Sequence, residues 1–154
     1  MKRIIFALLL PMAGAPGQAL AQCDLGVATR LDETALSKLL TDHTVCAVPG
    51  SSHQGSPGDR WQEEHLSGGA LWDYKQGNCT LGIAGCNNPR AQVGTWSITG
   101  SGDNAAVSYT YYGGGSHTRS VFDHTSHYSF CEGSLEYARA TVTDLGSGCA
   151  TFPP

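Results

Sequence analysis

The chain has 154 residues, of which 14% are charged, and its formal net charge at pH 7 is -4. A chain of this length fits one domain with a single hydrophobic core. Because the balance is acidic and no basic cluster occurs, the sequence lacks the charge pattern of proteins that bind nucleic acids or anionic membranes, and we expect neither partner.

The N-terminus has the order of a secretory signal peptide. Lys2 and Arg3 supply positive charge, "IIFALLL" is the apolar segment, and Ala19-Leu20-Ala21 is a small-residue cleavage site. The apolar segment is far shorter than the roughly 20 residues of a transmembrane helix. Cleavage after residue 21 would remove both positive charges and change the net charge from -4 to -6. Residues 22–154 would then form one periplasmic or secreted domain without membrane attachment.

Six cysteines follow the predicted cleavage site: Cys23, Cys46, Cys79, Cys86, Cys131 and Cys149. An even number in an exported chain predicts three disulfide bonds. Zinc is the alternative, but the spacings contain no Cys-x-x-Cys pair, and this favours bridges. The sequence does not choose among the fifteen possible pairings. Our working expectation is sequential pairing: Cys23 with Cys46, Cys79 with Cys86, and Cys131 with Cys149.

One short α-helix is predicted at about 32–42. Asp32 is a suitable N-cap, and Leu36, Leu39 and Leu40 recur at helical spacing. The sequence that follows, "VCAVPGSSHQGSPG", is rich in Pro, Gly and Ser, which predicts a flexible connector over 45–59.

After the connector, short aromatic and β-branched runs alternate with turn residues. They predict seven strands, at 60–66, 70–76, 92–99, 105–112, 117–123, 127–132 and 136–143. This series predicts an all-β domain, an antiparallel up-and-down meander that forms a small barrel or half-barrel, with the helix plugging or covering one end. Between two of the strands, we expect a Cys79–Cys86 bridge to staple a loop at 77–91.

One hairpin can be predicted in register. If the chain reverses at Thr125-Ser126, the numbers of facing residues sum to 251. Val121 then faces Phe130, Asp123 faces Tyr128, and Arg119 faces Glu132, which gives an apolar pair, a possible hydrogen bond and a pair of opposite charges. A four-residue loop from His124 to His127 would keep the same register.

Four segments together resemble a family of small exported bacterial proteins of unassigned function. The segments are "LSKLLTDHTVC", "GGALWDYK", "QVGTWSI" and "YSFC". The family is similar in its Leu-Leu…Thr and Gly-Thr-Trp patterns and implies a lipocalin-like (calycin-like) β-barrel. His43 precedes Thr44 where the family pattern has Asn. The Gly-Thr-Trp triplet lies in mid-chain, whereas the Gly-x-Trp of lipocalins opens the first strand. The resemblance implies no activity.

We expect a non-enzymatic exported binding protein without a cofactor. Its partner would be a small apolar molecule held in an aromatic interior, or an extracytoplasmic protein or glycan that contacts its loops. The candidate ligand-binding residues are Trp61, Trp72, Trp96, Tyr109 and Tyr111. The alternative for these rings is that they only fill the core.

Two other functional classes fit parts of the sequence. The loop at 77–91 could present a rigid surface to a secreted hydrolase and inhibit it. A metal-dependent hydrolase could be built from Glu63, His65 and Asp73 with the His124/His127 pair, which would face each other across the hairpin. Two histidines do not complete a metal site, so we expect no bound metal. Alternation places Glu63 and His65 on one face of a strand of mixed polarity, which we expect at the edge of the barrel.

Overall fold

The computed structural model describes residues 23–24, 26, 28–51, 60–74 and 90–153. The elements, in chain order, are β1 (Thr29–Arg30), α1 (Glu33–Leu40), β2 (His43–Pro49), β3 (Trp61–His65), β4 (Ala70–Tyr74), β5 (Arg90–Thr99), the 3-10 turn η1 (Gly102–Asn104), β6 (Ala106–Tyr111), β7 (Ser116–Asp123), β8 (Tyr128–Glu132) and β9 (Leu135–Asp144). Within these residues no helix is long and apolar enough to cross a membrane.

The sheet closes into an antiparallel barrel of eight strands. Its order runs β7-β6-β5-β4-β3-β2-β9-β8, and β8 pairs again with β7. β1 adds a short ninth strand beside the end of β7. Each strand from β2 to β9 pairs with the next one in the chain, which confirms the predicted meander. The additional pairing of β2 with β9 closes the ring, so the sheet is a barrel rather than a half-barrel. Closure leaves no long unpaired strand edge in the eight-stranded ring.

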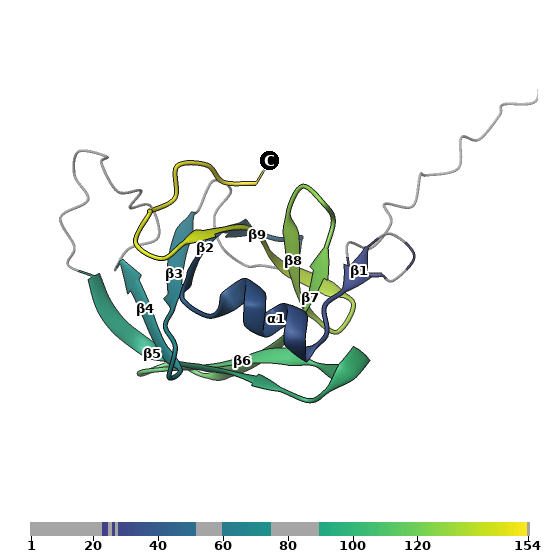
Figure 1. Ribbon diagram of the computed structural model, residues 1–154, viewed down its shortest axis with the longest axis horizontal. Helices are drawn as coiled ribbons and strands as arrows, with labels where there is room; N and C mark the ends of the chain where they lie inside the picture. Colours follow the sequence, from purple (N-terminus) through teal and green to yellow (C-terminus); the bar gives the residue numbers. More distant parts are fainter. Residues whose placement is uncertain (1–22, 25, 27, 52–59, 75–89, 154) are drawn as a thin grey trace, which may run out of the picture.

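The helix lies among the strands, against β2, β5 and β6 (Figure 1). It begins as predicted, because the Asp32 carboxylate accepts a hydrogen bond from the backbone N–H of Ala35 at 2.8 Å. Leu36 and Leu40 are fully buried in the core. After the helix, Asp42 adopts a left-handed backbone with φ 56°, and its N–H donates to the carbonyl of His65 at 2.7 Å. This turn ties the end of α1 to the end of β3.

The flexible connector predicted over 45–59 is wrong at its beginning, because β2 extends from His43 to Pro49. Val45 and Ala47 belong to the core, and the strand pairs with β3 on one side and β9 on the other. Pro49, one of the residues that suggested a connector, is the last residue of β2 and pairs with Ala138 of β9. Residues 52–59, and the loop predicted at 77–91 up to residue 89, lie outside the described residues.

The predicted β7–β8 register is confirmed. Val121 pairs with Phe130 and Asp123 with Tyr128, and the Arg119 guanidinium lies 3.1 Å from the Glu132 carboxylate. The Asp123 carboxylate accepts its hydrogen bond from the backbone N–H of Thr125, at 2.7 Å. Thr125 has φ 70°, so this turn needs a left-handed residue even though no glycine occupies it.

The sequential disulfide pairing is wrong. Cys23 bonds Cys131, and Cys46 bonds Cys149; the expected Cys79–Cys86 bridge lies outside the described residues. Val45, Ala47 and Phe130 belong to the core, so alternation places Cys46 and Cys131 on the outer faces of β2 and β8. Cys131 bonds the segment that precedes β1, and Cys46 bonds the C-terminal segment. The two bridges therefore fasten the described segments before β1 and after β9 to the outside of the barrel.

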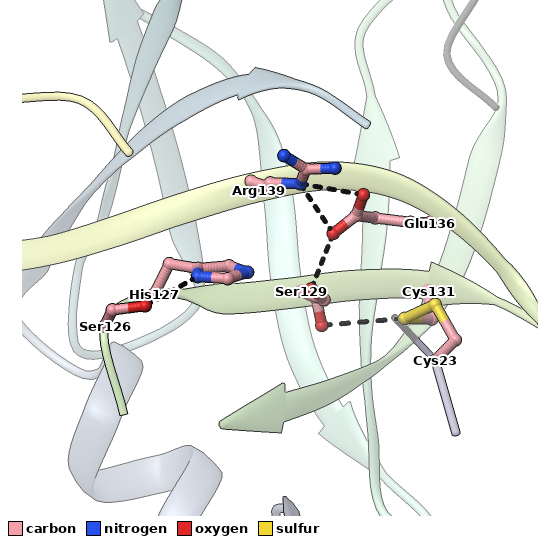
Figure 2. Close-up of polar contacts among 7 residues, drawn as sticks. All are labelled: Cys23, Ser126, His127, Ser129, Cys131, Glu136 and Arg139. Atoms are coloured by element: carbon pink, nitrogen blue, oxygen red, sulfur yellow. Dashed lines mark hydrogen bonds and ion pairs between the residues drawn. A yellow bond between two sulfur atoms is a disulfide. The ribbon is translucent and has the colours of Figure 1, made fainter. Parts of the chain in front are cut away.

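A buried carboxylate, that of Glu136, lies on the outer side of the barrel beside the Cys23–Cys131 bridge. Glu136 accepts hydrogen bonds from Arg139 Nε at 2.9 and 3.1 Å and from Ser129 Oγ at 2.6 Å, as Figure 2 shows. Glu136 is 1% exposed. The bond from Ser129 connects β8 to β9 next to Cys131, at the point where the register between the two strands shifts.

Candidate functional site

Two aromatic side chains, Trp96 and Tyr109, lie against His65 inside the barrel. The His65 ring lies edge-on to Trp96, with centroids 5.1 Å apart, and to Tyr109, at 5.6 Å. His65 Nε2 is 3.1 Å from the Tyr109 hydroxyl, and Nδ1 is 3.2 Å from the Glu63 carbonyl. Because a carbonyl only accepts, Nδ1 carries the proton and Nε2 accepts from Tyr109. Burial lowers the pKa of His65 to about 3, so the ring is neutral at neutral pH.

A buried carboxylate continues this interior cluster. Tyr111 donates to Glu63 Oε1 at 2.6 Å, and its ring stacks on Tyr109. Burial raises the pKa of Glu63, while the bond from Tyr111 and the charge of Arg119 act in the opposite direction. Burial, together with the charge of Glu63, raises the pKa of both tyrosines.

Arg119 places a cation beside these groups. Its guanidinium lies 3.6 Å from the centre of the Tyr137 ring and 5.6 Å from that of Tyr109. Glu132 neutralises it at 3.1 Å, and His117 lies 3.4 Å from the same carboxylate. The Arg119 side chain is 5% exposed and that of Glu132 is 43% exposed. The cluster thus leads from the closed interior to the end of the barrel where β7 begins and β8 ends.

The Gly-Thr-Trp triplet has a structural role in this arrangement. A Cβ atom at Gly94 would lie 2.2 Å from the Thr110 carbonyl, so β5 and β6 approach closely only because residue 94 is glycine. Trp96 points inward, and its Nε1 donates to the Leu66 carbonyl at 3.1 Å. The indole is thereby fixed against His65.

The candidate ligand-binding residues are only partly brought together. Trp96, Tyr109 and Tyr111 share the interior cluster, and Trp61 packs against the edge of the core. Trp72 lies apart on the outer face, where the Arg90 guanidinium is 4.4 Å from its ring centre and also pairs with Glu64. Trp96 and Tyr109 are 8% and 1% exposed, so in this conformation they fill the core and offer little surface to a ligand.

The residues of the proposed hydrolase are divided between two regions. Glu63 and His65 face the interior, as alternation predicted, and Asp73 pairs with Glu63 from β4. The expectation of an edge strand is wrong, because β3 lies between β2 and β4 and Glu63, Glu64 and His65 are all buried. The sequence analysis predicted the strand that follows β3 but not β2, which pairs with the other side of β3.

The His124/His127 pair lies on the β7–β8 hairpin. The two rings are stacked, with centroids 4.7 Å apart and planes at 1°, and Ser126 bonds the His127 Nδ1 (Figure 2). The nitrogen lone pairs lie in the ring planes, so parallel rings do not direct them to one ion. Burial and the neighbouring His124 lower the pKa of His127. Among the described residues, no group of three or more His, Cys, Asp or Glu could hold a metal.

A cleft of about 410 Å³ lies beside the helix, and we call it the α1 cleft. Its apolar wall contains Leu31, Ala35 and Leu39 from the helix region and Val142 from β9. Ionisable and polar groups surround this wall: Lys38, His43, Asp123, Tyr128, Thr143 and Asp144. The Thr41 carbonyl accepts from His43 Nδ1 at 2.7 Å, which leaves Nε2 of the neutral ring as an acceptor.

The sequence analysis did not identify the α1 cleft. The helix was predicted, but its Leu36/Leu40 side was not distinguished from the side with Leu31, Ala35 and Leu39. A signal existed in the spacing, because Ala35 and Leu39 are four residues apart and share a face with Leu31. His43 was missed because residues after the helix were not assigned to a strand.

No model of a protein family matches the chain, and comparisons with curated proteins and with solved structures find no significant similarity.

Proposed function

We propose that the protein is an exported, non-enzymatic binding protein that holds a small amphipathic molecule in the α1 cleft. The observation that carries this proposal is a concave site with one apolar wall and several ionisable groups around it. A volume of about 410 Å³ falls in the range of small-molecule sites, which combine an apolar lining with a few placed polar groups.

Charge narrows the class of molecule. Lys38 contributes one formal positive charge, while Asp123 and Asp144 contribute two formal negative charges, so acidic groups outnumber basic ones around the cleft. The negative groups would repel the carboxylate of a fatty acid, whereas they would not repel an amine or an uncharged polar head group. The preferred ligand has an apolar chain of a few carbons and an amine or hydroxyl group.

Export is supported by the signal-like N-terminus and by the two disulfide bonds that tie both ends of the domain to the barrel. Such bonds persist in oxidising compartments outside the cytoplasm. The resemblance to exported lipocalin-like proteins agrees with this location. A binding site next to α1 would differ from a ligand cavity along the axis of the barrel.

The test compares an alkyl amine, an alkanol and a carboxylate of equal chain length in thermal-shift and calorimetric titrations. We expect the amine and the alkanol to raise Tm, because a ligand at 100 times its Kd adds about 2.7 kcal/mol to the free energy of unfolding. Ala35→Phe fills the cleft and should abolish the shift. Thr34→Phe adds the same ring at an exposed neighbouring position outside the cleft and should retain it. Lack of a shift with every amphiphile, or equal shifts in both variants, would contradict the proposal.

A further inference from the structure

Two rows of hydroxyl side chains cross the outer face of β5, β6 and β7. In one row Thr95 pairs with Thr110 and Thr110 with Ser116; in the other, Ser97 pairs with Ser108 and Ser108 with Thr118. The alternate residues Trp96, Tyr109 and Arg119 point into the barrel, so the hydroxyl residues point outward. We call these six residues the hydroxyl face.

The hydroxyl face is exposed, uncharged and internally ordered. Five of its six residues are exposed and Ser108 is half-buried. Ser108 Oγ lies 2.9 Å from Thr118 Oγ1, and Thr110 Oγ1 lies 3.2 Å from Ser116 Oγ. Short side chains that already contact one another lose little rotamer freedom when a partner binds. Threonine is common on strands, but every position of both rows carries a hydroxyl and none carries a charge.

An exposed tyrosine borders these rows. Tyr112 follows β6 and is 62% exposed. Gln92 Nε2 donates to the Tyr112 hydroxyl at 2.8 Å and to the Gly94 carbonyl at 3.2 Å, so the phenol is held by β5. An oriented ring in water beside hydroxyl groups presents an apolar face and hydrogen-bonding groups together.

We propose that the hydroxyl face and Tyr112 bind an extended neutral polysaccharide. Each sugar unit has an apolar ring face suited to Tyr112 and hydroxyl groups that exchange hydrogen bonds with Ser and Thr. Neighbouring strands repeat at about 4.8 Å, which is close to the length of one hexose in an extended chain. A polymer laid across β5, β6 and β7 therefore meets a similar set of hydroxyl groups at each step. An anionic polymer finds no cation in the two rows. This surface is separate from the α1 cleft.

The test is native gel electrophoresis of the protein in gels that contain hydroxyethyl cellulose, galactomannan or dextran, with alginate as the anionic polymer. We expect at least one neutral polymer to retard the wild type equally at low and high salt. Tyr112→Ala should weaken this binding about five- to tenfold, and Thr110→Lys should weaken it further by displacing the chain from the face.

Two matched variants serve as controls. Leu135→Ala removes an apolar side chain that is 58% exposed, and Ser126→Lys adds a cation on the β7–β8 hairpin; both should be retarded like the wild type. Circular dichroism checks that each variant is folded. The proposal is overturned if no neutral polymer retards the wild type, if only alginate does so, or if Tyr112→Ala and Thr110→Lys bind unchanged. A dimer that Thr110→Lys dissociates would also overturn it, because the face would then be a protein interface.

Discussion

The two halves of the barrel interior are filled by different kinds of side chains. Around α1 the core is aliphatic, with Leu36, Leu40, Val45, Val107 and Val121 in one cluster. Toward the other end, Glu63, Tyr111 and Arg119 are buried or half-buried. Tyr111 bonds Glu63, and Arg119 pairs with the exposed Glu132. The groups in this polar half satisfy each other, whereas the ionisable groups near α1 surround a cleft. We therefore place the ligand site beside the helix and assign the polar half a structural role.

The largest expected effect concerns His65, which lies where the two halves meet. Its protonation makes the free energy of unfolding depend on pH. Its folded pKa is about 3 and its ordinary value is 6.5, so the unfolded chain binds a proton first as the pH falls. The contribution to stability is complete above about pH 6.5 and is lost toward pH 3. From about pH 7 to about pH 4 this loss is on the order of 3 kcal/mol.

Urea unfolding at several pH values measures this effect. His65→Gln should be less stable at neutral pH but should have a much shallower acid dependence than the wild type. Ser37→Ala, an exposed change on α1 that removes no titrating group, should keep the wild-type slope. Equal slopes for the wild type and His65→Gln would show that the ring is hydrated and that the interior is more open than in this structure.

The aliphatic half is tested by Leu36→Ala. Leu36 is fully buried, and its truncation should lower the free energy of unfolding by about 3 kcal/mol through lost transfer energy and a cavity. Ser37→Ala, an exposed change on the same helix, should stay within about 0.5 kcal/mol. A loss below about 1 kcal/mol for Leu36→Ala would mean that α1 is not an integral part of the core.

The polar half is tested by Arg119→Met. This change removes the cation from two tyrosine rings and leaves Glu132 without that partner, but Glu132 is partly hydrated. We expect a loss of about 2 kcal/mol, less than for a fully buried pair. Because Arg119 lowers the pKa of Glu63, Arg119→Met should also raise that pKa, as measured by carboxyl NMR titration. Arg119→Lys keeps the charge and should restore most of the Glu63 pKa but not the ring stacking. An unchanged Glu63 pKa in the Met variant would show that the charge of Arg119 has no effect on Glu63, which would contradict this prediction.

The same contrast explains what sequence could predict. The β7–β8 register follows from local pairs such as Val121 with Phe130, so it was predictable from a turn and two short strands. The pairing of the cysteines was not predictable from local sequence. Cys46 meets Cys149 only after β2 has paired with β9 and the C-terminal segment has crossed the outer face of β2. Alternation placed Glu63 and His65 together, but their burial depends on the closure of the whole barrel. The sequence could not separate Trp72 from Trp96, because aromatic content does not reveal which face of a strand turns inward.

The smallest expected effect comes from Tyr111→Phe. The change keeps the ring and its stack on Tyr109 and removes only the bond to Glu63 Oε1. We expect a loss of about 1 kcal/mol near pH 7. Since the lost bond lowers the Glu63 pKa, that pKa should rise. A carboxyl with a raised folded pKa is most stabilising below its unfolded pKa and loses this contribution as the pH rises through the folded value. The deficit of Tyr111→Phe should thus shrink in acid, where Glu63 is protonated in both proteins.

The adjacent tyrosine supplies the control for this experiment. Tyr112→Phe removes a hydroxyl bonded to Gln92 on the outer face and should change stability by less than about 0.5 kcal/mol at either pH. If Tyr111→Phe behaves in the same way, the Tyr111–Glu63 bond is exchangeable with water. The polar half would then be accessible, and its carboxylate and cation could contact a ligand, which would end the division of roles between the two halves.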